Sequence, residues 1–365
     1  MSGSADPSPQ GSDPEGSGAP REVQRQPRSD LVFVGGTGRS GTHLVAKLIG
    51  RHAEFENVPI EVRFHADRGG FPDLLAGRTT KERFLRRLRG FWWKRYRSGG
   101  RPPDILPWFS LGREPRGLHK FVDRGIFDAA TSRFSERFDA DPEAACRELF
   151  EALLRPLAER EGKPGLVEMS CATAVAAPAL ARIFPDALFI HVVRDGRDAS
   201  ASRVRQGRGL LNPRTRVQGV RWWEGRVRRI EAALAELPSD RVLTLSLDWL
   251  VQVPPNRRGY RLMRRFLGVE KQKTADTMFK RKVNPDRANV GRWRRGLSED
   301  QQDKVRAEYE AAIERLEADG LVSAPLLREI YRFEGQQVGS EQTGLAEANV
   351  AHGAEDAARG GGAEE

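Results

Sequence analysis

A short apolar run that ends in glycines and leads into a helix constrains this chain most. Leu31–Val34 is apolar, and the residues after it, GGTGRSGTHL, are rich in glycine up to a helical pattern that begins at Thr42. Glycine permits tight turns and close approach of a ligand to the backbone. Amides at a helix N-terminus point at an anion. The pattern predicts a strand, a phosphate-type cradle and a helix to about Arg51.

Three further apolar runs predict strands of the same sheet. They are Leu166–Met169, Ala187–Val193 and Arg241–Leu247, and the second is almost continuously apolar, as the buried strands of a parallel sheet are. Helical patterns alternate with these strands. The order predicts an α/β protein with a three-layer P-loop-type fold, in which helices flank a central parallel sheet. The helical patterns lie at about 142–161, 178–184, 214–236, 256–267 and 298–318.

The two ends of the chain differ in composition from the part between them. Residues 1–28 are rich in Ser, Gly, Pro and Asp, and residues 339–365 are rich in Gly, Ala and Glu. Both are predicted to be disordered tails, because neither carries enough apolar side chains to form a core. Residues 29–338 are predicted to form one domain. Within it, residues 64–120 read as an irregular insertion over the acceptor site, partly helical at 80–97.

Several classes of protein are disfavoured. Cys146 and Cys171 stand in no Cys or His cluster, which argues against a zinc site and a disulfide framework. No apolar stretch is long enough for a transmembrane helix, and the N-terminus lacks a signal-peptide pattern. We therefore expect a cytoplasmic protein without a membrane anchor. The net charge of +10 favours an anionic partner without choosing which.

The glycine-rich loop is not an ordinary Walker A loop, which has Lys directly before Ser or Thr. Here Gly41 precedes Thr42, and the cation stands earlier, at Arg39. No acidic strand end nearby suggests a Mg²⁺ ligand. The loop is therefore expected to hold an anion whose charge is met by protein groups and not by a metal.

A second motif, FIHVVRDGRDASASRV, follows the clearest strand. Arg194 lies at the end of that strand, and Ser202 lies about two turns into the helix that follows. At the carboxyl edge of a parallel sheet, both side chains would reach one phosphate. The alternative reading is a salt-bridged Arg–Asp pair at a helix start.

Together the two motifs resemble the superfamily of sulfotransferases that use PAPS (3′-phosphoadenosine 5′-phosphosulfate). Its loop GxGRSGT corresponds to Gly36–Thr42, and its strand-end Arg with a later Ser corresponds to Arg194 and Ser202. The segment VEMSCAT and the strand after it look like those of bacterial members. NVGRWRRGLSEDQ, residues 289–301, resembles the C-terminal loop and helix that close over the cofactor. The resemblance covers about residues 30–334.

The resemblance implies the ligand contacts. Arg39 would contact the bridging and sulfuryl oxygens of PAPS, Arg194 and Ser202 would bind the 3′-phosphate, and Gly291 and Arg292 would belong to the closing loop. PAP (3′-phosphoadenosine 5′-phosphate) would be the product, and no metal is implied. The 5′-phosphosulfate cradle would be Gly38, Arg39, Ser40, Gly41, Thr42 and His43.

The resemblance also suggests a general base for the acceptor hydroxyl. In the tyrosylprotein and carbohydrate branch, a Glu with an Arg two residues later follows the loop's helix. Glu61 and Arg63 resemble this pair, which makes Glu61 the expected base. The alternative is a surface ion pair of little energetic value. His65 and His119 are the other candidates for the base.

Two basic and aromatic segments allow more than one reading. KERFLRRLRGFWWKRYR, residues 81–97, suits a solvated helix whose aromatic rings pack inward, an acceptor site or a membrane contact. Trp222 and Trp223 lie among Arg221, Arg226, Arg228 and Arg229. That stretch is expected to pack its rings in the core and to expose a basic outer face.

The expected function is transfer of a sulfuryl group from PAPS to a hydroxyl acceptor, which would be a small molecule, glycan, lipid or peptide. Two other functions are weighed. A P-loop kinase is disfavoured by the missing Lys before Thr42. A nucleic-acid-binding protein is suggested by the charge and by residues 81–97, but no recognised nucleic-acid motif supports it, and we expect no nucleic-acid partner. The acceptor and the oligomeric state are left open.

Overall fold

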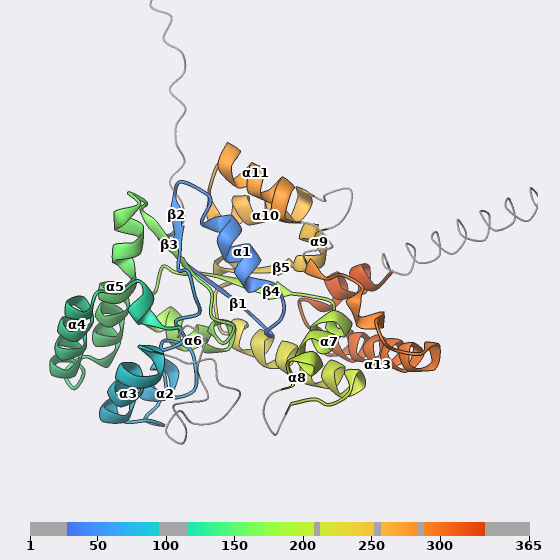
Figure 1. Ribbon diagram of the computed structural model, residues 1–365, viewed down its shortest axis with the longest axis horizontal. Coiled ribbons are helices and arrows are strands. Elements are labelled where there is room, and N and C mark those ends of the chain that lie inside the picture. The colour runs from blue at the N-terminus through green and yellow to red at the C-terminus, as the bar shows by residue number, and fades with distance from the viewer. Residues whose placement is uncertain (1–27, 95–115, 208–211, 252–256, 284–287, 333–365) are drawn as a thin grey trace, which may run out of the picture.

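One parallel sheet organises the molecule, whose computed structural model describes residues 28–94, 116–207, 212–251, 257–283 and 288–332. Figure 1 shows the sheet in the middle of the fold with helices on both of its faces. The strand order is β2-β3-β1-β4-β5, and all four pairings are parallel. The predicted three-layer α/β fold is confirmed. The strands are β1 (Leu31–Gly36), β2 (Phe55–Asn57), β3 (Gly165–Glu168), β4 (Leu188–Val193) and β5 (Val242–Ser246).

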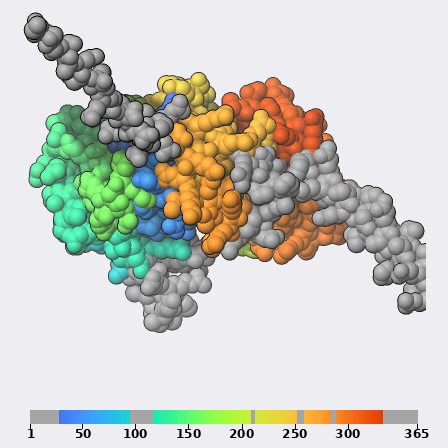
Figure 2. Space-filling model, turned by 90° about the horizontal axis from the view of Figure 1, so that it is seen from above, coloured from blue at the N-terminus to red at the C-terminus, as the bar shows by residue number. Residues whose placement is uncertain are grey.

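The apolar runs become strands that are covered on both faces. Along β1, Phe33 belongs to one buried cluster, whereas Val32 and Val34 belong to another, as alternation along a strand requires. The cluster around Val32 contains side chains of α1 (Thr42–Ile49), α9 (Leu247–Val251), α10 (Arg257–Leu267) and α11 (Lys273–Lys282). In Figure 2, the orange helices α10 and α11 lie against the blue N-terminal part of the fold.

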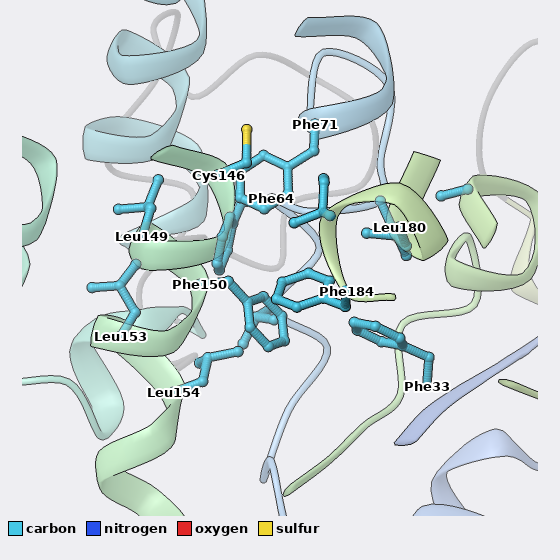
Figure 3. Packing of buried hydrophobic residues seen from close by; sticks show 14 of the residues in the cluster. Phe33, Phe64, Phe71, Cys146, Leu149, Phe150, Leu153, Leu154, Leu180 and Phe184 are labelled. Atoms are coloured by element: carbon cyan, nitrogen blue, oxygen red, sulfur yellow. The ribbon is translucent and has the colours of Figure 1, made fainter. Parts of the chain in front are cut away.

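Aromatic rings fill the other side of the sheet. The ring of Phe33 lies 5.5–5.7 Å from the rings of Phe150, Phe184 and Phe189 and of His65. Figure 3 shows several of these rings packed together between strand and helices. Such pairs add about 0.5–1.5 kcal/mol beyond the burial of their area. The helices on this face are α2 (Phe71–Leu75), α4 (Arg124–Arg137), α5 (Pro142–Arg160) and α6 (Thr173–Ile183).

A third cluster joins α7 (Gly196–Gln206), α8 (Arg216–Leu234) and α13 (Glu299–Ala318). The rings of Trp223 and Tyr309 pack at a tilt inside it, with their centres 5.4 Å apart. Both α8 and α13 begin with capping boxes, formed by Thr215 with Gln218 and by Ser298 with Gln301. This cluster fixes the helices that follow β4, and with them the end of that strand.

The described part of the segment 64–120 contains more helix than the sequence predicted. It contains α2, α3 (Lys81–Arg87), a π-helical stretch Leu88–Trp92 and a short 3₁₀ turn Leu118–Lys120. Residues 95–115 and both predicted tails lie outside the described residues, apart from Arg28. Among the described residues, no helix is both long and apolar enough to cross a membrane.

Candidate active site

The sheet topology places a crevice at the ends of β1 and β4. These strands are neighbours, yet the chain leaves β1 toward β2 at one edge of the sheet and leaves β4 toward β5 at the other. In open α/β sheets, ligands bind outside the carboxyl ends of strands at such a switch point. The glycine-rich loop follows β1, and Arg194 follows β4. The two sequence motifs therefore meet where the fold favours a ligand.

The loop after β1 is shaped as an anion cradle. Gly38 and Gly41 have φ angles of 83° and 90°, which side chains of L-residues rarely allow. A Cβ at Gly38 would meet no atom within 4 Å, so the loop faces open space there. No side chain caps the start of α1. The first amides of α1 are thus left for a ligand.

The two motifs are hydrogen-bonded to each other. Arg194 donates from Nη1 to the carbonyl oxygen of Arg39 at 3.0 Å, and Arg39 donates from Nε to Ser202 Oγ at 2.8 Å. Arg194 also donates from Nη2 to the carbonyl oxygens of Ala288 and Asn289. Its buried Nε has no hydrogen-bond partner in the part of the chain that the structure describes. Arg194 therefore joins the loop after β1 to the segment before α13.

Backbone strain gathers at the same place. Among the described residues, three that are not glycine have positive φ: Arg39 at 66°, Arg63 at 68° and Asn289 at 60°. All three line one cleft of about 1890 Å³. Non-glycine residues in this region cost of order 1–3 kcal/mol each and cluster at functional sites. The strain marks this cleft independently of any motif.

Glu61 lies in the cleft next to the cradle. Cys171 Sγ donates to Glu61 Oε1 at 3.3 Å, and His43 Nε2 lies 3.7 Å from the same oxygen. Burial alone would raise the pKa of Glu61. The hydrogen bond from His43 and the charge of Arg63 outweigh it and lower that pKa to about 2. The carboxylate is therefore ionised at neutral pH. Arg63 itself pairs with Asp67 at 2.6 Å.

His65 does not face the cleft. It is fully buried, and its Nε2 lies 2.9 Å from Oε2 of Glu168, which is fully buried as well. Glu168 accepts from the amide and hydroxyl of Ser170 at 3.0 and 2.6 Å. Ser170 Oγ in turn accepts the amide of Arg63 at 3.2 Å. This network fixes the segment that carries Glu61 and Arg63, and the sequence analysis missed Glu168 in it.

His119 and most described residues of the segment 81–97 do not line the cleft. His119 shares a hydrogen bond of 2.7 Å with the carbonyl oxygen of Trp93 and is absent from the described lining. Phe84 and Trp92 are buried in the core. Arg87 and Phe91 line the cleft, so one side of the described part of this segment contributes to the site.

The expected closing loop, residues 289–301, meets the cleft at its start. Ala288 and Asn289 line the cleft, whereas Gly291, Arg292, Ser40 and Ser202 are absent from its described lining. The amides of Gly291 and Trp293 donate to the Asp198 carboxylate at 2.8 and 2.9 Å. Burial and the charge of Asp195 raise the pKa of Asp198. The loop is thereby fastened to the start of α7.

The expected basic outer face of α8 is correct only in part. Trp223 is buried in the core, but Trp222 and Arg226 line the cleft. Their direction depends on how α8 packs on α6 and α7, which a local pattern does not contain. The described residues hold no group of three or more His, Cys, Asp or Glu side chains that suits a metal ion.

Comparison with known proteins identifies the family. A family model described as "Sulfotransferase family" matches residues 31–273. The chain belongs to the sulfotransferase family. Its members transfer sulfuryl groups, so the chain is a transferase.

Solved structures with a similar fold are also sulfotransferases. The sulfotransferase domain of the Synechococcus PCC 7002 olefin synthase is 17% identical, with a TM-score of 0.43, and the match covers 79% of this chain and 96% of that one. Sulfotransferase STF9 from Mycobacterium avium is 16% identical, with a TM-score of 0.42, and the match covers 81% and 78%. None of the curated proteins matches the chain significantly.

Proposed function

We propose that this sulfotransferase transfers the sulfuryl group of PAPS to a hydroxyl group of its acceptor. The observation that carries the proposal is the contact between the two motifs, in which Arg194 binds the backbone of Arg39 and Arg39 binds Ser202. This contact gathers two guanidinium groups and the uncapped start of α1 at one crevice. A donor with two separate phosphate groups fits such an arrangement.

The residues of the crevice fit PAPS by their chemistry. The open space at Gly38 and the free first turn of α1 suit a 5′-phosphosulfate, and the unpartnered Nε of Arg194 suits a 3′-phosphate. Bound PAPS supplies a sulfuryl group attached to a good leaving group. Arg39 is placed to stabilise negative charge on the transferred group and on the departing phosphate.

Glu61 is proposed as the general base. Its carboxylate lies in the cleft beside His43, the second residue of α1, and its low pKa keeps it deprotonated at neutral pH, which is the form that can accept a proton from the acceptor hydroxyl. Cys171 and His43 orient the carboxylate through the same oxygen, Oε1. Glu61 would therefore accept the proton beside the start of α1, next to the proposed phosphosulfate cradle.

Calorimetric titration with PAP, and with ATP plus Mg²⁺ in parallel, tests the proposal. We expect PAP to bind in EDTA and ATP to bind much more weakly. Binding of ATP without a response to PAP would overturn the proposed donor and favour a kinase.

A further inference from the structure

The cleft carries more positive charge than the proposed donor site uses. Besides Arg39 and Arg194, its lining includes Arg68, Arg87, Arg116, Arg203 and Arg226. The carboxylates in the described lining are Glu61 and Asp67, and Asp67 is already paired with Arg63. Two carboxylates do not neutralise this set of guanidinium groups. The excess suits a second anion besides the donor.

Arg226 is the most unusual of these cations. It lies in the middle of α8 and is half-buried, and its Nε is fully buried without a hydrogen-bond partner. It is close enough to Cys171 and Asp67 to interact with them electrostatically. Burial lowers the pKa of Arg226, and the charges of Arg229 and Arg203 lower it further. The folded protein thus holds this charge at a cost.

Arg203, on the neighbouring helix α7, resembles Arg226 in lining the cleft with a buried Nε. Its Nε is buried without a hydrogen-bond partner among the described residues, whereas its Nη1 donates to Gln206 Oε1 at 3.0 Å. Its guanidinium lies 5.1 Å from the ring centre of Trp222. Burial lowers the pKa of Arg203, and so does the nearby charge of Arg39. Arg203 interacts with Arg39 on one side and with Arg226 on the other. The positive charge therefore extends from the donor loop toward Cys171, the partner of Glu61.

The other arginines of α8 show that this lack of partners is specific to the cleft. On its outer side, Arg221 bonds Glu308, and Arg228 bonds Glu224 and Asp319. These pairs satisfy the guanidinium groups with carboxylates of α8 itself and of α13 and its C-terminal end. Arg226 has no such hydrogen bond or ion pair among the described residues. The remaining arginines of α8, Arg216 and Arg229, bond backbone carbonyl oxygens. Among the described residues of this helix, Arg226 is the arginine whose side chain has no such bond, which suits it to bind a ligand.

We propose that Arg226 and Arg203 form an anion subsite for the acceptor, so that the acceptor carries a phosphate, sulfate or carboxylate group as well as its reactive hydroxyl. The inference rests on the proposed function, because it takes the donor to occupy the crevice between Gly38 and Arg194. A guanidinium binds such oxyanions through two parallel hydrogen bonds. An anion on Arg226 would lie near Cys171, which orients Glu61, and would hold the hydroxyl on the side of the base.

Titration of the PAP-saturated protein with three matched probes tests the subsite. The probes are glycerol 3-phosphate, glycerate and glycerol, which share a carbon skeleton and differ in charge. We expect the two anions to bind and glycerol not to bind at the same ionic strength, and the stronger of the two identifies the preferred anion. Equal binding of glycerol and the anions would overturn the proposal.

Variants of α8 place the subsite. Arg226→Met should weaken the binding of the anions by roughly tenfold or more, whereas Arg229→Met, which removes an exposed arginine three residues away, should leave it unchanged. The affinities for PAP and for adenosine 5′-phosphosulfate should be unaffected by Arg226→Met. Loss of the phosphosulfate affinity alone would assign Arg226 to the donor's sulfuryl group and overturn the proposal.

Thermal unfolding of the ligand-free protein separates this role from a structural one. Because Arg226 is held without a partner, Arg226→Met should unfold at the same or a higher temperature than the wild type. A clearly lower temperature would show that Arg226 stabilises the fold and would count against the subsite. If the wild type fails to bind PAP, the proposed donor is wrong. If PAP binds and no probe distinguishes charge, only the subsite is wrong.

Discussion

At the scale of single residues, the site depends on how neighbours set the state of each side chain. Burial alone would raise the pKa of Glu61 and favour its protonated form, but His43 and Arg63 lower that pKa and keep the carboxylate ionised. Arg194 serves both as a tie between segments and as a cation with one free buried nitrogen. Each of these residues can be tested by a change that keeps its shape or removes its charge.

Replacing Glu61 by Gln should leave PAP affinity unchanged and lower turnover by about 10²–10⁴, because the base is lost while the cradle stays intact. Release of PAP from PAPS, followed with any acceptor that supports turnover, measures this. Asp128→Asn, a change of an exposed carboxylate on α4, is the matched control. Wild-type turnover in Glu61→Gln would show that another group takes the proton.

Replacing Arg194 by Ala should weaken PAP binding much more than binding of adenosine 5′-phosphosulfate, which lacks the 3′-phosphate. Some loss for both ligands is expected because Arg194 also holds the backbone of Arg39. Calorimetry with the two ligands gives the difference. Equal losses would mean that Arg194 only joins segments and does not contact the 3′-phosphate.

At the scale of elements, the network of Glu168 shows how a strand end fixes a catalytic segment. Ser170→Ala removes the hydroxyl that bridges Glu168 and the amide of Arg63. We expect turnover to fall while PAP affinity is kept, together with a loss of about 1 kcal/mol in the free energy of unfolding. Thr131→Val removes a hydroxyl that bonds a carbonyl oxygen within α4, and it should lower stability without affecting turnover. Equal turnover in both variants would contradict a positioning role for Ser170.

The sequence predicted the elements that carry strong local patterns. The four apolar runs became β1, β3, β4 and β5, and the long amphipathic patterns became α5, α8, α10 and α13. β2 was missed because it has three residues, of which Glu56 and Asn57 are polar. α4 was missed because its apolar residues make only a weak face. Where the local pattern is as weak as in β2 and α4, packing against neighbouring elements decides the secondary structure.

The residues that line the cleft follow the same division. The glycine-rich loop and Arg194 could be assigned to one crevice because a strand, a turn and a helix stand together in each sequence motif. The positions of Arg203, Arg226 and Glu168 could not be predicted, because no local pattern shows which way these side chains face. Arg226 enters the cleft only through the packing of α8, and Glu168 becomes important only when residues 61–65 fold over the end of β3.

At the scale of the whole molecule, buried histidines set how the fold responds to acid. His191 is fully buried in β4, and neither of its ring nitrogens has a partner. Burial lowers the pKa of His191 from 6.5 to about 3. Below about pH 6.5, the unfolded chain therefore binds a proton that the folded chain excludes, and stability is lost as the pH falls.

We expect His191→Leu to remove this sensitivity. Between pH 7 and pH 5, the wild type should lose about 2 kcal/mol more of its free energy of unfolding than the variant does. Urea unfolding at pH 7, 6 and 5 measures the difference. Ile190→Val, a change of packing at the neighbouring position without a titrating group, should follow the wild type. Parallel pH dependence in wild type and His191→Leu would contradict the assignment.

The central position of β1 has a consequence for how the protein is made. Leu31 pairs with Leu166 and Val32 pairs with Leu188, so both neighbours of β1 come from the middle of the chain. During synthesis on the ribosome, which proceeds from the N-terminus, the first strand leaves the exit tunnel long before either partner does. Nascent chains arrested before β4 has emerged should therefore fail to retain PAP. The loop after β1 is translated before both neighbours of that strand, and its surroundings are complete only after both have emerged.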